Sequence, residues 1–225
     1  MESTAPTEPR INELEPQTDN RLDTMPIMSS VKKRPKRGAL PTAFLSMSEI
    51  KSLMAAITRL RDRAIFSVAY HRGLRASEVG MLQMRDYTAP TINARTGGLY
   101  VRRLKDSDSK IYSPTRPEQK ELRNWLRVRG DYEGAPIFPS SRRRGIGRKM
   151  LDVLMKHYGK LAAIPKELRH FHALKHSCGV HLLLQGLGVD QVKEWLGHRN
   201  INNTMVYLRV ANIRLDAAAE KLANW

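Results

Sequence analysis

Residues 192–210 read VKEWLGHRNINNTMVYLRV. The first part has the apolar spacing of a short helix that ends near a glycine, and we expect that helix over residues 188–198. The second part, residues 203–210, is expected to be helical too. Two side chains here could take part in proton or group transfer, His198 directly after the glycine and Tyr207 nine residues further on.

The segment before it, HALKHSCGVHLLLQG over residues 172–186, is apolar on one face and ends at a glycine. His172 and His176 are four residues apart, so on a helix they share a face, as two zinc ligands would. No glutamate follows His172 as an H-E-x-x-H motif requires, and Cys178 is the only cysteine. A metal site is therefore not expected here.

The remaining pattern is helical around one β-rich insert. Residues 89–115 contain β-branched and aromatic residues and two turn signals, which predict about three antiparallel strands. Ser46 followed by Glu49 is a capping box. Helices are expected over residues 46–57, 62–73, 75–84, 116–130 and 150–162. The fold class is therefore mainly α with a small antiparallel β-sheet, that is, α+β.

The charge balance points to a polyanionic partner. The 225 residues carry 39 Lys and Arg against 22 Asp and Glu, a net charge of +17. Nucleic acid is the first candidate and an anionic membrane surface the second. No apolar run approaches the roughly 20 residues of a membrane-spanning helix, so no membrane partner is expected. The polar N-terminus lacks the apolar stretch of a secretory signal, and an intracellular protein is expected.

Two segments concentrate the positive charge. Residues 1–40 have a disordered composition and end in a basic run, while order is expected from about residue 41 to residue 225. The run is either a solvated linker or an arm that follows a phosphate backbone; the Gly-containing loop 140–149 is either a flexible surface loop or a phosphate contact. The expected DNA-binding side chains are Lys32, Lys33, Arg34, Lys36, Arg37, Arg142, Arg143 and Arg144.

The residues that could carry chemistry are scattered along the chain but suit one substrate. Cationic groups, imidazoles and a phenol are what cleavage of a phosphodiester needs: positive charge at the non-bridging oxygens, a nucleophile, and an acid for the leaving oxygen. Each residue alone could be ordinary, and Lys110 flanks the same turn as Lys105. The set is Arg75, Lys105, His172, Lys175, His198 and Tyr207.

With these residues, the chain resembles the catalytic domain of the tyrosine recombinases, or phage integrases. The matching pieces are YHRGLRASEVGMLQMRDY, VRRLKDSDSK, HALKHSCGVHLLLQG and VKEWLGHRNINNTMVYLRV, in the family's order and spacing, and the similarity covers roughly residues 43–225. The resemblance implies the DNA breaking–rejoining fold and a double-stranded DNA substrate.

The resemblance also implies a role for each residue. Tyr207 would attack the scissile phosphate to give a 3′-phosphotyrosyl bond and a free 5′-hydroxyl. Arg75 would bind the non-bridging oxygens with its planar guanidinium, and Lys105 would protonate the leaving 5′-oxygen. His172 would handle the proton of the nucleophile, and His198 would donate a hydrogen bond to a phosphate oxygen.

Further implications concern the surroundings of this site. Glu78, one turn after Arg75, would orient the catalytic groups from behind them. Lys175 would add positive charge at the phosphate. No metal or nucleotide cofactor is expected, since the covalent link conserves the energy of the broken bond.

Two departures from the family are visible. The usual H-x-x-R motif reads His172-Ala-Leu-Lys175 here, which replaces a rigid, bidentate guanidinium with a flexible point charge. The helical DNA-clamping domain that typically precedes the catalytic one has no counterpart in residues 1–40. Either the basic arm replaces it, or the chain is a truncated product with weak affinity.

The expected function is a site-specific DNA recombinase or integrase that works as a homodimer on each site and a tetramer at synapsis, in the cytoplasm on the nucleoid. A type IB topoisomerase-like nicking and rejoining enzyme and a catalytically weakened DNA-binding relic are the alternatives. An apolar helix over residues 215–225 is expected to pack on its own domain or on a neighbouring subunit.

Overall fold

The computed structural model describes residues 44–91, 97–104, 107–130 and 135–208. Every described residue belongs to one compact unit, Ala39–Trp225. The tail over residues 1–40 and the helix over residues 215–225 lie outside the described residues, so both stay predictions. No helix in the described part is long and apolar enough to cross a membrane.

The sheet has three antiparallel strands in the order β1-β2-β3, which confirms the expected small sheet, although its first strand lies just before the expected range 89–115. The strands are β1 (Tyr87–Thr88), β2 (Gly98–Val101) and β3 (Lys110–Tyr112). The central strand pairs Leu99 with Tyr112 on one side and with Tyr87 on the other. Leu99 and Val101 are fully buried while Ile111 is exposed, so one face of the sheet packs on the core.

Helices make up most of the rest, and they confirm the α+β class. The first two end close to where the apolar periodicity ends, whereas the two short 3₁₀ turns were not expected from the sequence. The elements are α1 (Met47–Ala56), α2 (Leu60–Arg72), α3 (Ala76–Met81), η1 (Met84–Asp86), α4 (Arg116–Arg129), α5 (Arg148–Leu161), η2 (Lys166–Leu168), α6 (His172–Leu184) and α7 (Val189–Leu196). Residues 202–208 are helical as well.

The expected capping box starts α1. The Ser46 hydroxyl accepts a hydrogen bond from the Glu49 amide at 3.2 Å, and the Glu49 carboxylate accepts one from the Ser46 amide at 2.7 Å. The neighbouring Leu45 amide donates to the Ser177 hydroxyl of α6 at 2.9 Å. The first described residues are therefore tied to the helix that carries the HALKH motif.

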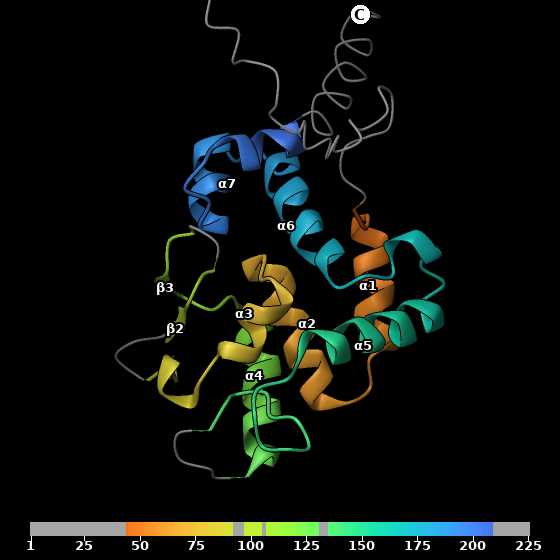
Figure 1. The fold of residues 1–225 in the computed structure, drawn as a ribbon, viewed down its shortest axis with the longest axis vertical. Coiled ribbons are helices and arrows are strands. Elements are labelled where there is room, and N and C mark those ends of the chain that lie inside the picture. Colours follow the sequence, from red (N-terminus) through yellow and green to blue (C-terminus); the bar gives the residue numbers. More distant parts are fainter. Residues whose placement is uncertain (1–43, 92–96, 105–106, 131–134, 209–225) are drawn as a thin grey trace, which may run out of the picture. The chain divides into compact units, whose positions relative to one another are not determined.

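Helix α2 lies at the centre of the fold and packs against α4 and α6 (Figure 1). Its middle is enclosed on all sides, because residues 64–66, 68 and 69 are all fully buried apolar side chains. Phe66 meets Phe171 and Tyr158 edge to face, with ring centroids 5.5 and 5.9 Å apart. At the end of α2, Arg72 donates to the Glu118 carboxylate at 2.7 Å and to the Ser113 carbonyl at 2.9 Å.

The apolar core forms two clusters, and α6 contributes to both. The larger joins α1, α2, α4, α5 and the sheet. The smaller consists of Cys178 and Val180 of α6, Val192 and Leu196 of α7, and Tyr207. The candidate nucleophile is therefore a core residue of the C-terminal cluster.

Candidate active site

The site begins at the turn between α2 and α3. Gly73 ends α2 with φ +54°, and a Cβ there would lie 2.3 Å from the Leu196 Cδ2 atom, so the turn requires glycine. Arg75 follows as the N-cap of α3. The buried Glu78 accepts hydrogen bonds from the Arg75 amide at 2.8 Å and from its Nη1 at 2.7 Å.

Arg75 is held by two further contacts. Its Nη1 donates to the Leu104 carbonyl at 2.8 Å and to the Ser107 hydroxyl at 3.1 Å. The side chain keeps one fifth of its surface exposed and borders a cleft of about 620 Å³. The guanidinium is therefore fixed on one side and open to the cleft on the other, which suits anion binding.

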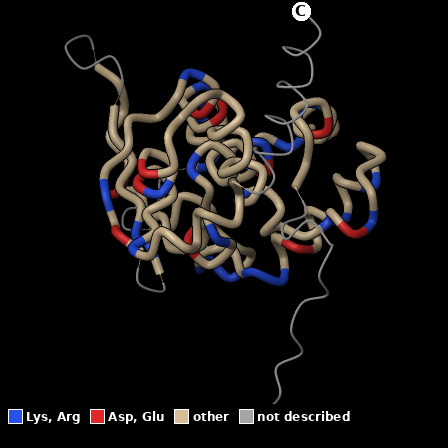
Figure 2. The backbone as a smooth tube through the Cα atoms, turned by 90° about the horizontal axis from the view of Figure 1, so that it is seen from above, with Lys and Arg blue, Asp and Glu red and all other residues tan. Residues whose placement is uncertain are grey.

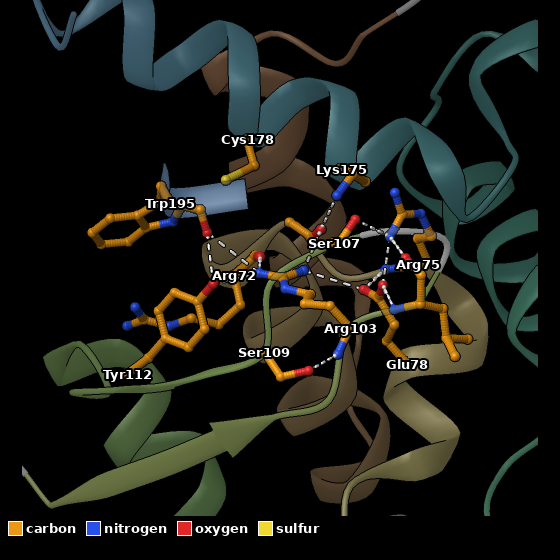
Figure 3. A network of polar contacts seen from close by, with 12 residues as sticks. Arg72, Arg75, Glu78, Arg103, Ser107, Ser109, Tyr112, Lys175, Cys178 and Trp195 are labelled. Carbon is orange, nitrogen blue, oxygen red and sulfur yellow. Dashed lines mark hydrogen bonds and ion pairs between the residues drawn. The ribbon is translucent and has the colours of Figure 1, made fainter. Parts of the chain in front are cut away.

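Arg103 is a fully buried arginine behind Arg75 that was not expected in the site (Figure 3). Its guanidinium donates to Glu78 at 3.1 Å and to the Tyr112 hydroxyl at 2.9 Å. It also donates to the carbonyls of Gly73, Arg72 and Trp195, at 3.2, 2.7 and 3.3 Å. The Arg103 guanidinium thus links the sheet, the α2–α3 turn and α7 through its hydrogen bonds.

Glu78 lies between Arg75 and Arg103. Burial opposes its ionisation, but Arg103, Arg75 and Lys175 together lower the pKa of its carboxyl group. The Leu104 amide donates to the same carboxylate at 3.1 Å. The expected supporting position of Glu78 behind Arg75 agrees with these contacts.

Lys175 points from α6 toward the same turn (Figure 3). Its Nζ donates to the Gly73 carbonyl at 3.0 Å, and the residue is 2% exposed. Burial first, and then the charges of Arg103 and Arg75, lower the pKa of its ammonium group to about 7. The cation in the H-x-x-K motif is thus buried and near its titration midpoint at neutral pH.

His198 is buried directly after α7. Its Nδ1 lies 3.0 Å from the Thr204 hydroxyl, and the residue forms a β-bridge with Ser107. The Asp108 amide donates to the Gly197 carbonyl at 2.9 Å. Because Ser107 also contacts Arg75, the hairpin after β2 connects the first motif of the family to the LGH motif.

Tyr207 is 2% exposed and packs against α6. A Cβ on Gly179 would lie 2.6 Å from its ring, so the ring uses the space that this glycine leaves. The Tyr207 hydroxyl lies 3.2 Å from Nδ1 of His176. Burial is the main cause that raises the pKa of the phenol, and Arg75 opposes it.

His172 lies beside His176 rather than beside the phenol. The two imidazole rings meet edge to face with centroids 4.4 Å apart. His172 is exposed and lines the cleft together with His170 and Arg75. No group of three metal-ligating side chains is found in the described ranges.

The three imidazoles around the site favour their neutral forms. Desolvation is the largest cause in each case, followed by the charge of Lys175 for His172 and His198 and by the neighbouring His172 for His176. The pKa is lowered to about 4 for His172, to about 3 for His176 and to about 3 for His198. A phosphate entering the cleft would raise these values, because negative charge favours the imidazolium.

Several expected residues lie elsewhere. Lys105 and the arm residues Lys32, Lys33, Arg34, Lys36 and Arg37 lie outside the described residues. Lys110, the alternative to Lys105, pairs with Glu194 at 2.9 Å. Arg142, Arg143 and Arg144 are exposed on a turn that the Pro139–Gly145 bridge closes.

Sequence reasoning missed two residues of the site. His176 was considered only as a zinc ligand, although its position one turn after His172 placed it on the same helix face. Arg103 carries no sequence signal of its own, because it follows another arginine. Arg102 instead pairs with Asp86 and stacks 5.1 Å from the Tyr100 ring centroid.

The fold and the site together define the class of protein. The family model described as "Phage integrase family" matches residues 43–214. The chain therefore belongs to the phage integrase family.

Among curated relatives, the chain is 32% identical over 182 residues to tyrosine recombinase XerA of Pyrococcus furiosus, covering 79% of this chain and 60% of that protein. It is 31% identical over 171 residues to type 1 fimbriae regulatory protein FimB of Escherichia coli K12, and the match covers 73% of this chain and 82% of FimB. The chain thus spans less than two thirds of XerA but most of FimB.

Solved structures agree on the fold. The crystal structure of XerA recombinase matches with a TM-score of 0.65 and 26% identity, over 77% of this chain and 61% of that one. XerH recombinase bound to palindromic difH substrate, in a post-cleavage complex, matches with a TM-score of 0.67 and 20% identity. This match covers 80% of this chain and 53% of the XerH chain. The second likeness supports the fold alone.

Proposed function

We propose that this chain is a site-specific DNA recombinase or integrase, which cleaves and rejoins DNA strands through a covalent 3′-phosphotyrosyl intermediate. The observation that carries the proposal is geometric: Arg75 and His172 line one cleft, and Ser107 contacts Arg75 and pairs with His198. Lys175 donates to the Gly73 carbonyl in the turn that leads to Arg75. Family membership supports the same reading. Contacts between segments far apart in sequence thus gather these residues around the α2–α3 turn and α6.

The roles follow from the contacts of each side chain. Arg75 presents its exposed edge to the non-bridging oxygens of a phosphate in the cleft. Lys175 adds charge from α6, and His198 donates a hydrogen bond to a phosphate oxygen. Tyr207 is the nucleophile, and His172 handles protons at the wall of the cleft.

The supporting groups complete the chemistry. Lys105 is proposed as the acid that protonates the leaving 5′-oxygen, since Leu104 beside it touches both Arg75 and Glu78. Glu78 and Arg103 hold Arg75 in place. The phosphotyrosyl bond keeps the energy of the broken phosphodiester, so the reaction needs no metal or nucleotide cofactor.

The cleft offers a path for the DNA backbone. Arg148 and Lys156 of α5 line it together with Arg75, and Asp152 is the acidic residue among its lining side chains. Figure 2 shows lysine and arginine positions spread widely over the described backbone. We propose that a duplex lies along this side, with the loop arginines 142–144 and the basic arm over residues 32–37 contacting phosphates.

The proposed assembly is a homodimer on each site and a tetramer at synapsis, with residues 215–225 as a candidate contact between subunits. A protein with this substrate would work on the nucleoid in the cytoplasm. Deleting residues 213–225 separates two possibilities: the loss of assembly on DNA supports the contact between subunits, whereas unfolding of the monomer assigns the helix to its own core.

Covalent capture tests the proposed chemistry. The full chain is incubated with sheared duplex DNA from the genome that encodes it, the mixture is denatured in SDS, and trapped adducts are digested for mass spectrometry. We expect a phosphotyrosine at Tyr207 and its complete loss in Tyr207→Phe, because only the hydroxyl is removed. An adduct that persists in Tyr207→Phe, or none with the unaltered chain, contradicts the proposal.

The same experiment separates the alternatives. Sequencing the captured DNA identifies the target, and two duplexes carrying that target are then mixed. Exchanged strands support recombination, while relaxation of a supercoiled plasmid without exchange supports a type IB-like enzyme. DNA binding without any adduct would indicate a catalytically weakened relic.

A further inference from the structure

The contact between Tyr207 and His176 places a second imidazole at the reacting atom. The phenolic oxygen lies 3.2 Å from Nδ1 of His176, and the two ring centroids are 5.8 Å apart. Both residues are held by packing: Tyr207 is buried in the C-terminal cluster, and His176 lies within α6, whose Gly179 meets the tyrosine ring. The hydrogen bond therefore follows from the fold rather than from two mobile side chains.

Charged and titratable groups surround His176 on several elements. His172 and Lys175 lie on the same helix, His170 precedes that helix, and Tyr207 faces it from the C-terminal helical segment. Together with desolvation, the three basic neighbours keep the His176 imidazole neutral. A neutral imidazole with its proton on Nε2 leaves Nδ1 free to accept the tyrosine proton.

We propose that His176 is a further catalytic residue: it takes the proton from the Tyr207 hydroxyl as that oxygen attacks the phosphate. This inference rests on the proposed recombinase function. The bond from Oη to phosphorus forms, the bond from phosphorus to O5′ breaks, and the phenolic proton moves to Nδ1 of His176. A separate acid, Lys105 in the proposed scheme, protonates O5′, so charge and atoms balance.

The arrangement makes this transfer dependent on substrate. Without DNA, the proton stays on the phenol, because burial disfavours both the phenolate and the imidazolium. A phosphodiester beside Arg75 and His172 adds a negative charge to the cleft and stabilises the imidazolium. His172 contacts the His176 ring and lines the cleft. It is therefore the next titratable group after His176 on the way from the phenol to solvent.

The decisive experiment uses His176→Asn in the full chain. Asparagine keeps a short polar group near the position of Nδ1 but cannot hold the proton. The substrate is a nicked duplex carrying the captured target, made with either the normal 5′-oxygen or a 5′-sulfur at the scissile bond. A 5′-thiolate leaves without protonation, so it removes the need for the acid but not for the base.

At pH 7 and saturating DNA, we expect adduct formation by His176→Asn to be slower by roughly 10²–10⁴-fold. The 5′-sulfur substrate should restore the rate of Lys105→Ala but not that of His176→Asn. Below pH 7, where Lys175 keeps its charge, the rate of the asparagine variant should rise about tenfold per pH unit, since hydroxide must then remove the phenolic proton. His157→Asn on the exposed surface of α5 is the matched control and should react like the unaltered chain.

The results of this experiment distinguish a failure of the proposed function from a failure of the role proposed for His176. If the unaltered chain forms no adduct, the proposed function fails and this inference falls with it. If the unaltered chain reacts but His176→Asn keeps its rate within threefold and its pH profile, the function stands and His176 is not the acceptor. Rescue of His176→Asn by the 5′-sulfur would assign it to the acid side and equally overturn the inference.

Discussion

Lys175 combines a proposed role in the site with an unfavourable environment. It is buried beside Arg103 and Arg75, and its pKa is lowered to about 7 by burial and by these charges. In the unfolded chain its pKa is near 10.5. The folded protein therefore binds fewer protons than the unfolded chain between pH 7 and pH 10.5, and this residue makes folding more favourable as pH rises through that window.

Lys175→Met should therefore stabilise the protein while ending cleavage. The Gly73 carbonyl keeps its bond from Arg103, so the substitution leaves no buried acceptor without a donor. We expect a higher melting temperature than for the unaltered chain at pH 6, with the difference shrinking toward pH 10. Thermal melts across pH and adduct formation measure the two effects; a lower melting temperature at pH 6 would contradict the burial argument.

Lys175→Arg tests the departure from the family motif at the same position. A guanidinium stays charged throughout the window, so any loss of cleavage above pH 7 that stems from neutral Lys175 should disappear in this variant. Retention of normal cleavage by Lys175→Ala would remove the residue from the site.

At the scale of elements, α6 contributes buried side chains to both apolar clusters. The same helix bears His172, Lys175 and His176 of the candidate site. Its Gly179 lets the C-terminal helical segment approach closely enough for Tyr207 to reach His176. Glycine within a helix costs about 1 kcal/mol relative to alanine, so this position favours packing over helix propensity.

Gly179→Ala should displace the tyrosine ring and suppress adduct formation. The added Cβ would lie 2.6 Å from the ring, and the gain in helix propensity only partly offsets overpacking of about 1–3 kcal/mol. Gly147→Ala, directly before α5, is the control, because a Cβ there would meet no atom within 4 Å. Equal adduct rates in the two variants would show that the close packing at Gly179 is not needed.

At the scale of the whole molecule, the net charge of +17 should dominate DNA affinity. Each phosphate contact adds about 0.9 to the slope of log affinity against log salt concentration. The basic arm and the loop concentrate positive charge in the sequence, so we expect them to supply many of these contacts.

Replacing the arm cations should weaken this dependence. We expect alanine at Lys32, Lys33, Arg34, Lys36 and Arg37 to lower the salt slope by up to about 4.5, which is five contacts at about 0.9 each. Fluorescence anisotropy with a random duplex over a salt series measures the slope. An unchanged slope would mean that the arm does not contact DNA, and alanine at loop residues Arg142–Arg144 gives the comparison.

Much of the fold could be predicted because periodicity and glycine act locally. The capping box at Ser46, the helix end at Gly73 and the three-stranded insert follow from short-range rules. The 3₁₀ turns η1 and η2 could not be predicted, since short turns of this kind carry no apolar period. The residues of the site were named from motif resemblance, and their grouping came from packing.

The sequence by itself determined which side chains are present, their helix faces and a charge that calls for a polyanion. It could place His172 and His176 on one face but could not say which of them meets Tyr207, because a helix turn offers both equally. Tertiary packing made that choice: Gly179 admits the tyrosine ring, and the phenol then lies beside His176 while His172 borders the cleft. Packing likewise buried Arg103 behind Arg75, since contacts between distant segments are absent from local spacing.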